Sequence, residues 1–288
     1  KTFKKVLKST FLTSGPICKE VEKKIANRFS KKSCLLTNSW TNAVIGILKS
    51  LDLKAEDEVI IPNLTFVACA NVVEISGAKI IFADVDKNTL LLSIDDCIKK
   101  ITKKTKVIMP VHLYGNIFDT EELKRQIKKK TKKKIYIIED SAHSFSGTCK
   151  KNKPIGYHAD FAVFSFYATK NIAIGEGGMA ISDRELLINK MTTLGLHGMS
   201  RDAWKRFNDS QRTSYDVIEI GYKMNLTDLQ SAIGIIQLKR IEEMYSRRQE
   251  LWNYYDSELK ESEVEIPCLP TQGSGDKHAL HLYTIGLP

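Results

Sequence analysis

The residues best suited to chemistry are a lysine, an aspartate and a serine that each lie at or just after the end of a short apolar run. Lys170 leads into the glycine-rich stretch 175–178, Asp140 follows one apolar run, and Ser165 closes the next. Residues 38–41 follow the first run and open a helical pattern. A lysine amine attacks carbonyl groups, a carboxylate stabilises positive charge, and the free amides at a helix start bind phosphate.

Each of these features also has an ordinary structural explanation. A serine or threonine before a helix is usually an N-cap, an aspartate after a strand is usually a cap or an ion-pair partner, and 175–178 could be only a tight turn. Their combination is more specific. Pyridoxal 5'-phosphate (PLP) needs a phosphate cradle, a lysine that forms a Schiff base, and an acidic partner for its ring nitrogen. The sequence therefore favours a PLP site.

Seven short apolar runs alternate with longer amphipathic stretches, which predicts an α/β fold with a mostly parallel sheet. The link from the sixth run to the seventh is too short for a crossover helix, so we expect the seventh strand to pair antiparallel. Ligands of such sheets bind beyond the carboxyl ends of the strands, where the residues above lie. The predicted strands are 34–38, 58–62, 79–83, 106–112, 134–139, 160–165 and 178–182.

Helical patterns fill the gaps between the predicted strands and dominate the end of the chain. A last strand-like segment covers 280–287. The length of 288 residues corresponds to roughly two domains. We expect a large domain over 1–240, with an N-terminal segment, and the start of a small, incomplete domain over 241–288. The predicted helices are 41–51, 66–75, 93–101, 120–129, 185–194 and 227–259.

Composition narrows the class of protein and its partners. No apolar run reaches the ~18 residues of a membrane span, and no Cys/His cluster has metal-ligand spacing, so we expect neither a membrane partner nor a metal. The six scattered cysteines are typical of reduced thiols in a cytoplasmic protein. Lys and Arg total 44 against 34 Asp and Glu, which gives a net charge of +10 and favours an anionic partner.

The lysine-rich run 128–134 is the only feature that suggests nucleic acid as this partner. It has no interleaved aromatic residues for base stacking, and it ends a predicted helix, where cations complement the helix dipole. We therefore predict no nucleic-acid partner.

Five separated motifs resemble the DegT/DnrJ/EryC1/StrS family of PLP-dependent nucleotide-sugar aminotransferases. The resemblance implies a fold-type I PLP-dependent transferase with a three-layer large domain and a small C-terminal domain, which would be truncated here. The motifs are DEVIIP (57–62), PVHLYG (110–115), IEDSAH (138–143), FSFYATKN with GEGG (164–178) and GYKMNLTDLQ (221–230).

The resemblance also assigns roles to residues of the site. Lys170 would form the Schiff base with PLP, and Asp140 would pair with the pyridinium nitrogen. Tyr167 stands where many members have a histidine near the substrate. His112 would contact the substrate or serve as a structural histidine. The further cofactor-binding residues would be Trp40, Thr41, Asn42, Phe66, His143, Ser165 and Lys223.

The function implied is transfer of an amino group, with glutamate the usual donor, to a nucleotide-linked keto-sugar, in amino-sugar biosynthesis for a surface polysaccharide or glycoconjugate. The enzyme would be a homodimer with shared active sites, since Lys223 stands where many members have an asparagine that reaches the partner's cofactor. One alternative is a sugar dehydratase of the same family, although those members carry histidine at the position of Lys170. Another is a PLP-binding homologue whose site is disabled, either by the truncation or because Trp40 replaces a small residue.

Overall fold

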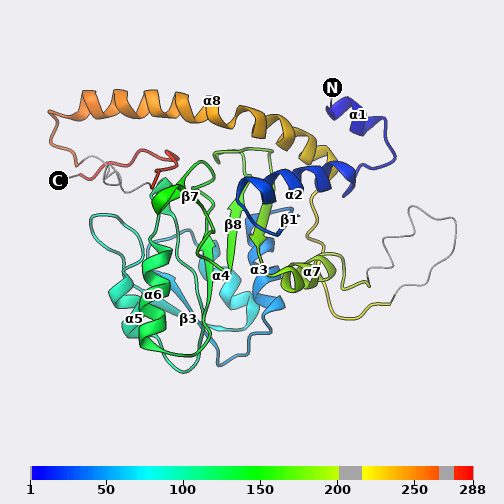
Figure 1. The fold of residues 1–288 in the computed structure, drawn as a ribbon, viewed down its shortest axis with the longest axis horizontal. Coiled ribbons are helices and arrows are strands. Elements are labelled where there is room, and N and C mark those ends of the chain that lie inside the picture. The colour runs from blue at the N-terminus through cyan, green and yellow to red at the C-terminus, as the bar shows by residue number, and fades with distance from the viewer. Residues whose placement is uncertain (1, 201–215, 266–275, 288) are drawn as a thin grey trace.

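A seven-stranded sheet forms the centre of the fold (Figure 1). The computed structural model describes residues 2–200, 216–265 and 276–287. The strand order is β1-β9-β8-β5-β4-β2-β3, and β9 is antiparallel to both neighbours while the other pairs are parallel. The strands are β1 (Ser33–Thr37), β2 (Glu58–Pro62), β3 (Lys79–Ala83), β4 (Thr105–Ile108), β5 (Tyr136–Asp140), β8 (Phe161–Ser165) and β9 (Gly178–Ser182).

All seven predicted strands are therefore confirmed, and so is the antiparallel pairing of the last one. A separate two-stranded ribbon joins β6 (Thr148–Cys149) and β7 (Lys153–Pro154). Two short 3₁₀ turns, Leu113–Gly115 and Lys150–Asn152, interrupt the loops.

The predicted helices are also present, and two more precede the first strand. No helix in the described part of the chain is both long and apolar enough to cross a membrane. The helices are α1 (Thr2–Leu7), α2 (Pro16–Arg28), α3 (Trp40–Ser50), α4 (Ala68–Ser76), α5 (Ile94–Lys100), α6 (Thr120–Lys130), α7 (Glu185–Leu194) and α8 (Asp228–Leu259).

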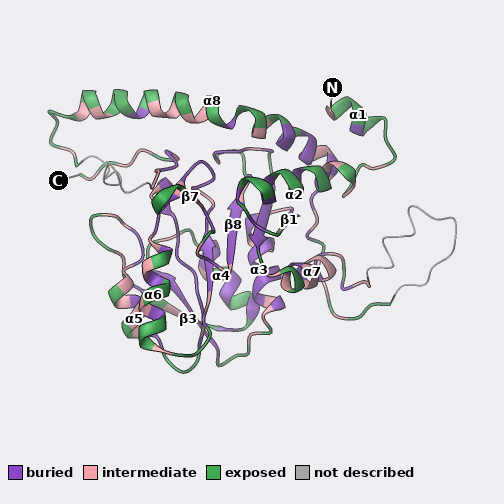
Figure 2. Ribbon diagram, in the orientation of Figure 1, coloured by how far each residue is buried: buried purple, intermediate pink, exposed green. Residues whose placement is uncertain are grey.

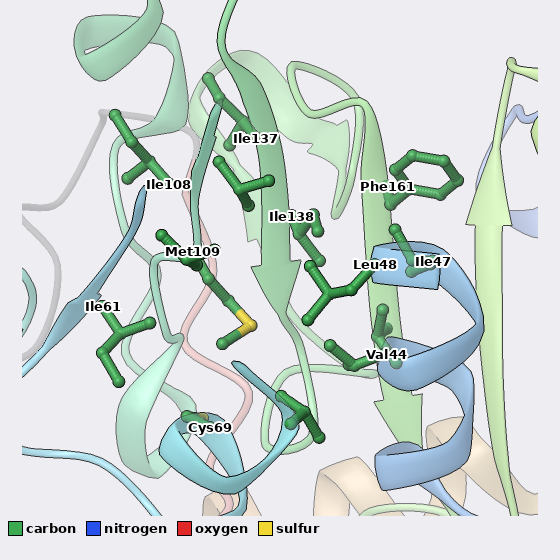
Figure 3. Close-up of a cluster of buried hydrophobic side chains, with 14 of the residues drawn as sticks. Val44, Ile47, Leu48, Ile61, Cys69, Ile108, Met109, Ile137, Ile138 and Phe161 are labelled. Carbon is green, nitrogen blue, oxygen red and sulfur yellow. The ribbon is translucent and has the colours of Figure 1, made fainter. Parts of the chain in front are cut away.

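The sheet is buried on both faces, so the fold has three layers. Along β8, Phe161 and Val163 belong to one hydrophobic core, whereas Ala162 and Phe164 belong to the other, as the two-residue period of a strand requires. The first core packs against α3 and its neighbours (Figure 3). The second packs against α2 and α8, and Figure 2 shows the strands buried between these layers. The predicted three-layer α/β architecture with a mostly parallel seven-stranded sheet is confirmed.

The buried carboxylate of Asp228 links the start of α8 to the start of α2 in the second helical layer. Asp228, the first residue of α8, accepts hydrogen bonds from the backbone amides of Gly15, Ile17 and Cys18, at 2.9, 3.1 and 2.8 Å. These amides belong to the start of α2, where no preceding turn can satisfy them. The cap for α2 thus comes from more than 200 residues away, which explains why local sequence patterns did not predict this helix.

The end of the described chain differs from the prediction. Residues 280–287 form no strand; instead, the amides of Ala279 and Leu282 donate to the carbonyls of Gly115 and Tyr114, at 2.8 and 3.1 Å. The partner of this segment is a turn, so a regular ladder cannot form. The predicted domain division after residue 240 falls inside α8, and it stays a prediction.

Two glycine-to-alanine substitutions test the packing, because they should change the free energy of unfolding in opposite directions. A Cβ on Gly178 would lie 2.4 Å from the backbone nitrogen of Trp40, so Gly178→Ala should destabilise the fold by about 1–3 kcal/mol. A Cβ on Gly234, within α8, would meet only Ile174 Cγ2 at 3.7 Å. Gly234→Ala should therefore stabilise by about 0.5–1 kcal/mol. Urea unfolding of both variants measures the difference, and equal midpoints would contradict the close contact at Gly178.

Candidate active site

A cavity of about 550 Å³ opens beyond the carboxyl ends of β5 and β8. It brings together most of the residues that the sequence singled out, from segments up to 130 positions apart. Of the predicted site residues, those lining it are Trp40, Thr41, Phe66, Asp140, His143, Ser165, Tyr167 and Lys170.

Asp140 is the buried charge of this cavity. It ends β5, and the pairing of β5 with β8 sets it beside Val163. One carboxylate oxygen accepts from the Ala142 amide at 3.0 Å, and the other accepts from the Cys69 thiol at 3.2 Å. Burial raises the pKa of Asp140, while these donors and the charge of Lys170 oppose the rise.

Lys170 lies in the loop between β8 and β9, and hydrogen bonds connect the two ends of this loop. The amide of Ile174 donates to the carbonyl of Phe166 at 3.0 Å, and that of Phe166 donates to Gly177 at 2.9 Å. The side chain of Asn171 ties the loop to the carbonyl of Ala279 at 3.1 Å. Burial lowers the pKa of Lys170, and Asp140 opposes this by stabilising the ammonium form. A larger share of the amine is therefore neutral than for an exposed lysine.

The start of α3 forms the anion-binding end of the cavity. Ser39 is the N-cap, and its hydroxyl accepts from the Asn42 amide at 3.1 Å. The first-turn amides of α3 have no partner within the helix and carry its positive dipole end. Thr41 and Ser165 add hydroxyl groups to the lining. Because Gly178 has no side chain, β9 can pass against this turn.

Aromatic residues form the remaining walls. His143 accepts a hydrogen bond on Nδ1 from the Tyr114 amide at 3.1 Å, and its ring stacks on His281 with centroids 4.3 Å apart. Burial, His281 and Lys170 lower the pKa of His143 to about 2, so the ring stays neutral. Phe66 and Tyr167 are 71% and 47% exposed, which leaves much of each ring accessible to a ligand.

Three predicted site residues lie outside this lining. His112 is fully buried behind the cavity, with Nε2 3.2 Å from the Glu139 carboxylate and Nδ1 accepting from the Phe118 amide at 3.0 Å. Asn42 lines a separate, apolar cavity of about 300 Å³. Lys223 is exposed. Of the three, His112 has the surroundings expected of a structural histidine and not of a residue that contacts the substrate.

The cavity also contains residues that sequence patterns did not single out, among them Leu64, Thr65 and Cys69. Thr65 and Cys69 flank Phe66 on a segment that matched no motif, so no signal marked them. His281 reaches His143 from the far end of the chain. It lies within the strand-like segment 280–287, but its contact depends on where that segment packs.

The donor set of the cavity fits PLP. Asp140 is 95% buried, yet its carboxylate receives only one amide and one thiol from the described residues, so a cationic N–H is the partner that it lacks. The α3 amides with Thr41 and Ser165 suit a phosphate, and Lys170 suits a carbonyl. Trp40 is compatible with this arrangement, since its side chain is buried.

Comparison with known proteins agrees with this fit. The sequence profile of the DegT/DnrJ/EryC1/StrS aminotransferase family matches residues 1–288. The protein MJ1066 of Methanocaldococcus jannaschii is 41% identical over 279 residues, which is 97% of this chain and 71% of that protein. The spore coat polysaccharide biosynthesis protein SpsC of Bacillus subtilis is 38% identical over 281 residues, covering 97% of this chain and 70% of SpsC.

Solved structures of similar fold include a putative sugar aminotransferase, Spr1654 of Streptococcus pneumoniae. Its PMP form superposes with a TM-score of 0.90 and 32% identity, over 98% of this chain and 74% of Spr1654. Its PLP form superposes with a TM-score of 0.89 and 31% identity, over 99% of this chain and 74% of that one.

Burial and Asp140 shift the pKa of Lys170 in opposite directions, and a substitution at Asp140 tests this. Asp140→Asn removes the charge that raises the pKa of Lys170, so this pKa should fall further and the neutral amine fraction at a given pH should rise. Lys170 should then react faster with trinitrobenzenesulfonate, as measured by mass spectrometry of its peptide. Asp52→Asn, which removes the partner of Lys190, is the control and should leave Lys170 unchanged. A slower or equal rate in Asp140→Asn would contradict the electrostatic coupling.

Proposed function

Because this chain belongs to the DegT/DnrJ/EryC1/StrS aminotransferase family and is a PLP-dependent sugar aminotransferase, we propose that it moves an amino group from glutamate to a nucleotide-linked keto-sugar. The observation that carries the proposal is the convergence of Lys170 and Asp140 on one cavity that also includes the start of α3. Glutamate and the nucleotide carrier rest on the family resemblance.

The chemistry divides between cofactor and protein. Bound PLP supplies an electron sink for the carbanion that forms when a proton leaves the substrate carbon. Asp140 keeps the ring nitrogen protonated, because a buried carboxylate stabilises an adjacent positive charge strongly. Lys170 would accept this proton on its neutral Nζ amine and carry it through the 1,3-shift, and its lowered pKa favours this role.

The proposed binding residues act in two groups. The amides at the start of α3, with Thr41 and Ser165, hold the phosphate, and Trp40 and Asn42 shape that turn. Phe66 covers one face of the ring. His143 donates from Nε2, since Nδ1 already accepts from the Tyr114 amide, which fixes the tautomer of the neutral imidazole.

The substrate would enter over Tyr167, whose half-exposed ring lines the cavity together with Lys170. A keto-sugar bound there needs its carbonyl carbon near the Lys170 amine, while its nucleotide diphosphate supplies binding energy from outside the cavity. The relation to SpsC, a spore coat polysaccharide biosynthesis protein, supports a product destined for a polysaccharide or glycoconjugate.

A homodimer with shared sites is part of the proposal. Lys223 is exposed and does not line the cavity of its own chain, as expected for a residue that serves the partner's phosphate. A cytoplasmic location is supported by the cysteines, because the five in the described residues are free thiols.

Cofactor uptake tests the central proposal. With PLP added, the protein should gain visible absorbance from cofactor bound to Lys170, and glutamate should bleach it as the amino group is transferred. Lys170→Ala should abolish that band and lower turnover by ~10³-fold or more. Lys190→Ala, at a lysine paired with Asp52, should leave both unchanged. A panel of nucleotide keto-sugars with glutamate identifies the acceptor, and a protein that stays colourless with PLP would refute the proposal.

Subunit mixing tests the role of Lys223. Lys223→Ala alone should weaken PLP binding, and mixing it with Lys170→Ala should restore activity to roughly a quarter of the unchanged enzyme, since half of randomly paired dimers would contain one intact site. Activity is measured after the chains are unfolded and refolded together. No restoration, or full activity of Lys223→Ala by itself, would count against a shared site.

A further inference from the structure

A cysteine thiol is one of the two donors that the described residues supply to the Asp140 carboxylate. Cys69, the second residue of α4, is fully buried and donates through Sγ to Asp140 Oδ2 at 3.2 Å. The other oxygen, Oδ1, accepts from the Ala142 amide at 3.0 Å. The two donors approach from different elements, so together they set the orientation of the carboxylate plane.

The thiol is itself held by a third residue. Thr65 donates through its hydroxyl to Cys69 Sγ at 3.1 Å. A thiol has one hydrogen, and because its sulfur accepts from Thr65, this hydrogen is free to point at Asp140. Thr65, Cys69 and Asp140 therefore form a directed chain of hydrogen bonds, and all three line the cavity.

We propose that Cys69 is a positioning residue for the aminotransferase reaction: oriented by Thr65, its thiol holds Asp140 in the conformation and ionised state that the ring nitrogen of PLP requires. This inference rests on the proposed function, because it assumes that Asp140 is the partner of that nitrogen. It adds Thr65 and Cys69 to the residues that control Asp140.

The surroundings of Cys69 favour a donor over a nucleophile or redox group. Burial raises its pKa, and the neighbouring Asp140 charge raises it further, so the thiol keeps its proton. Figure 3 shows Cys69 among the buried apolar side chains of the core that also contains Met109 and Ile61. In such surroundings an unsatisfied carboxylate oxygen is costly, and even a weak donor contributes to keeping it ionised.

Packing alone would not account for these contacts. Cys97 is also fully buried in the same hydrophobic core, and its thiol makes no hydrogen bond with the described residues. Cys97 is therefore the matched control for loss of a buried thiol without loss of a donor to Asp140.

The first experiment uses the protein without added cofactor. The infrared S–H stretching band of Cys69 is isolated as the difference between the unchanged protein and Cys69→Val. Its frequency falls as the thiol donates more strongly, so in Asp140→Ala the band should move to higher frequency. A band at the same position with and without the Asp140 carboxylate would overturn the contact.

The second experiment measures the dissociation constant of PLP by equilibrium dialysis. Cys69→Thr and Cys69→Val have the same shape, but only threonine keeps a donor. Cys69→Val should bind PLP about tenfold more weakly than Cys69→Thr, as expected for a lost hydrogen bond to a charged acceptor. Cys97→Val should bind like the unchanged protein. Equal constants for the two Cys69 variants, or an equal loss in Cys97→Val, would overturn the proposal.

Failure of the proposed function has a different signature. If the unchanged protein and all variants fail to bind PLP, the proposed function is wrong, and the positioning role of Cys69 with it. The infrared shift still decides whether the thiol donates to Asp140, because that measurement involves no cofactor.

Discussion

The constraint on which the site depends is a carboxylate buried at the end of a central strand. Asp140 is covered from bulk water, and the donors that reach it from the described residues are an amide and a thiol. Ionising such a group is unfavourable unless a cation lies beside it. The cavity in front of it, with Lys170 on its wall, is therefore shaped to receive a positive charge that the protein does not supply in full.

The sheet topology converts that constraint into a complete site. Parallel pairing of β5 with β8 sets Asp140 and Ser165 at the same edge, and the antiparallel return through β9 brings the Lys170 loop back over it. The absence of a side chain at Gly178 lets β9 approach the start of α3 closely. The Asp140 carboxylate, the anion-binding start of α3 and the Lys170 amine thus meet because the connections that follow β5, β1 and β8 begin at the same edge of the sheet.

Much of this arrangement was predictable because it is local in the sequence. Every strand of the central sheet is a short apolar run, and residues directly after the parallel runs must lie at the carboxyl edge. Long-range partners were not predictable. Helix α2 depends on a cap from Asp228, and the segment that includes residues 280–287 hydrogen-bonds to the turn at Tyr114 and Gly115 instead of pairing with a strand. Neither could be deduced from a local pattern.

The sequence by itself determined the class of fold, the order of the elements and the residue types available for PLP chemistry, because periodicity and motif spacing are properties of neighbouring residues. Tertiary structure decided which of them share the cavity. It buried His112 against Glu139, stacked His281 on His143 and turned the Cys69 thiol toward Asp140. These contacts depend on how distant segments pack, and packing sets the burial and the hydrogen-bond partners that control each ionisable group.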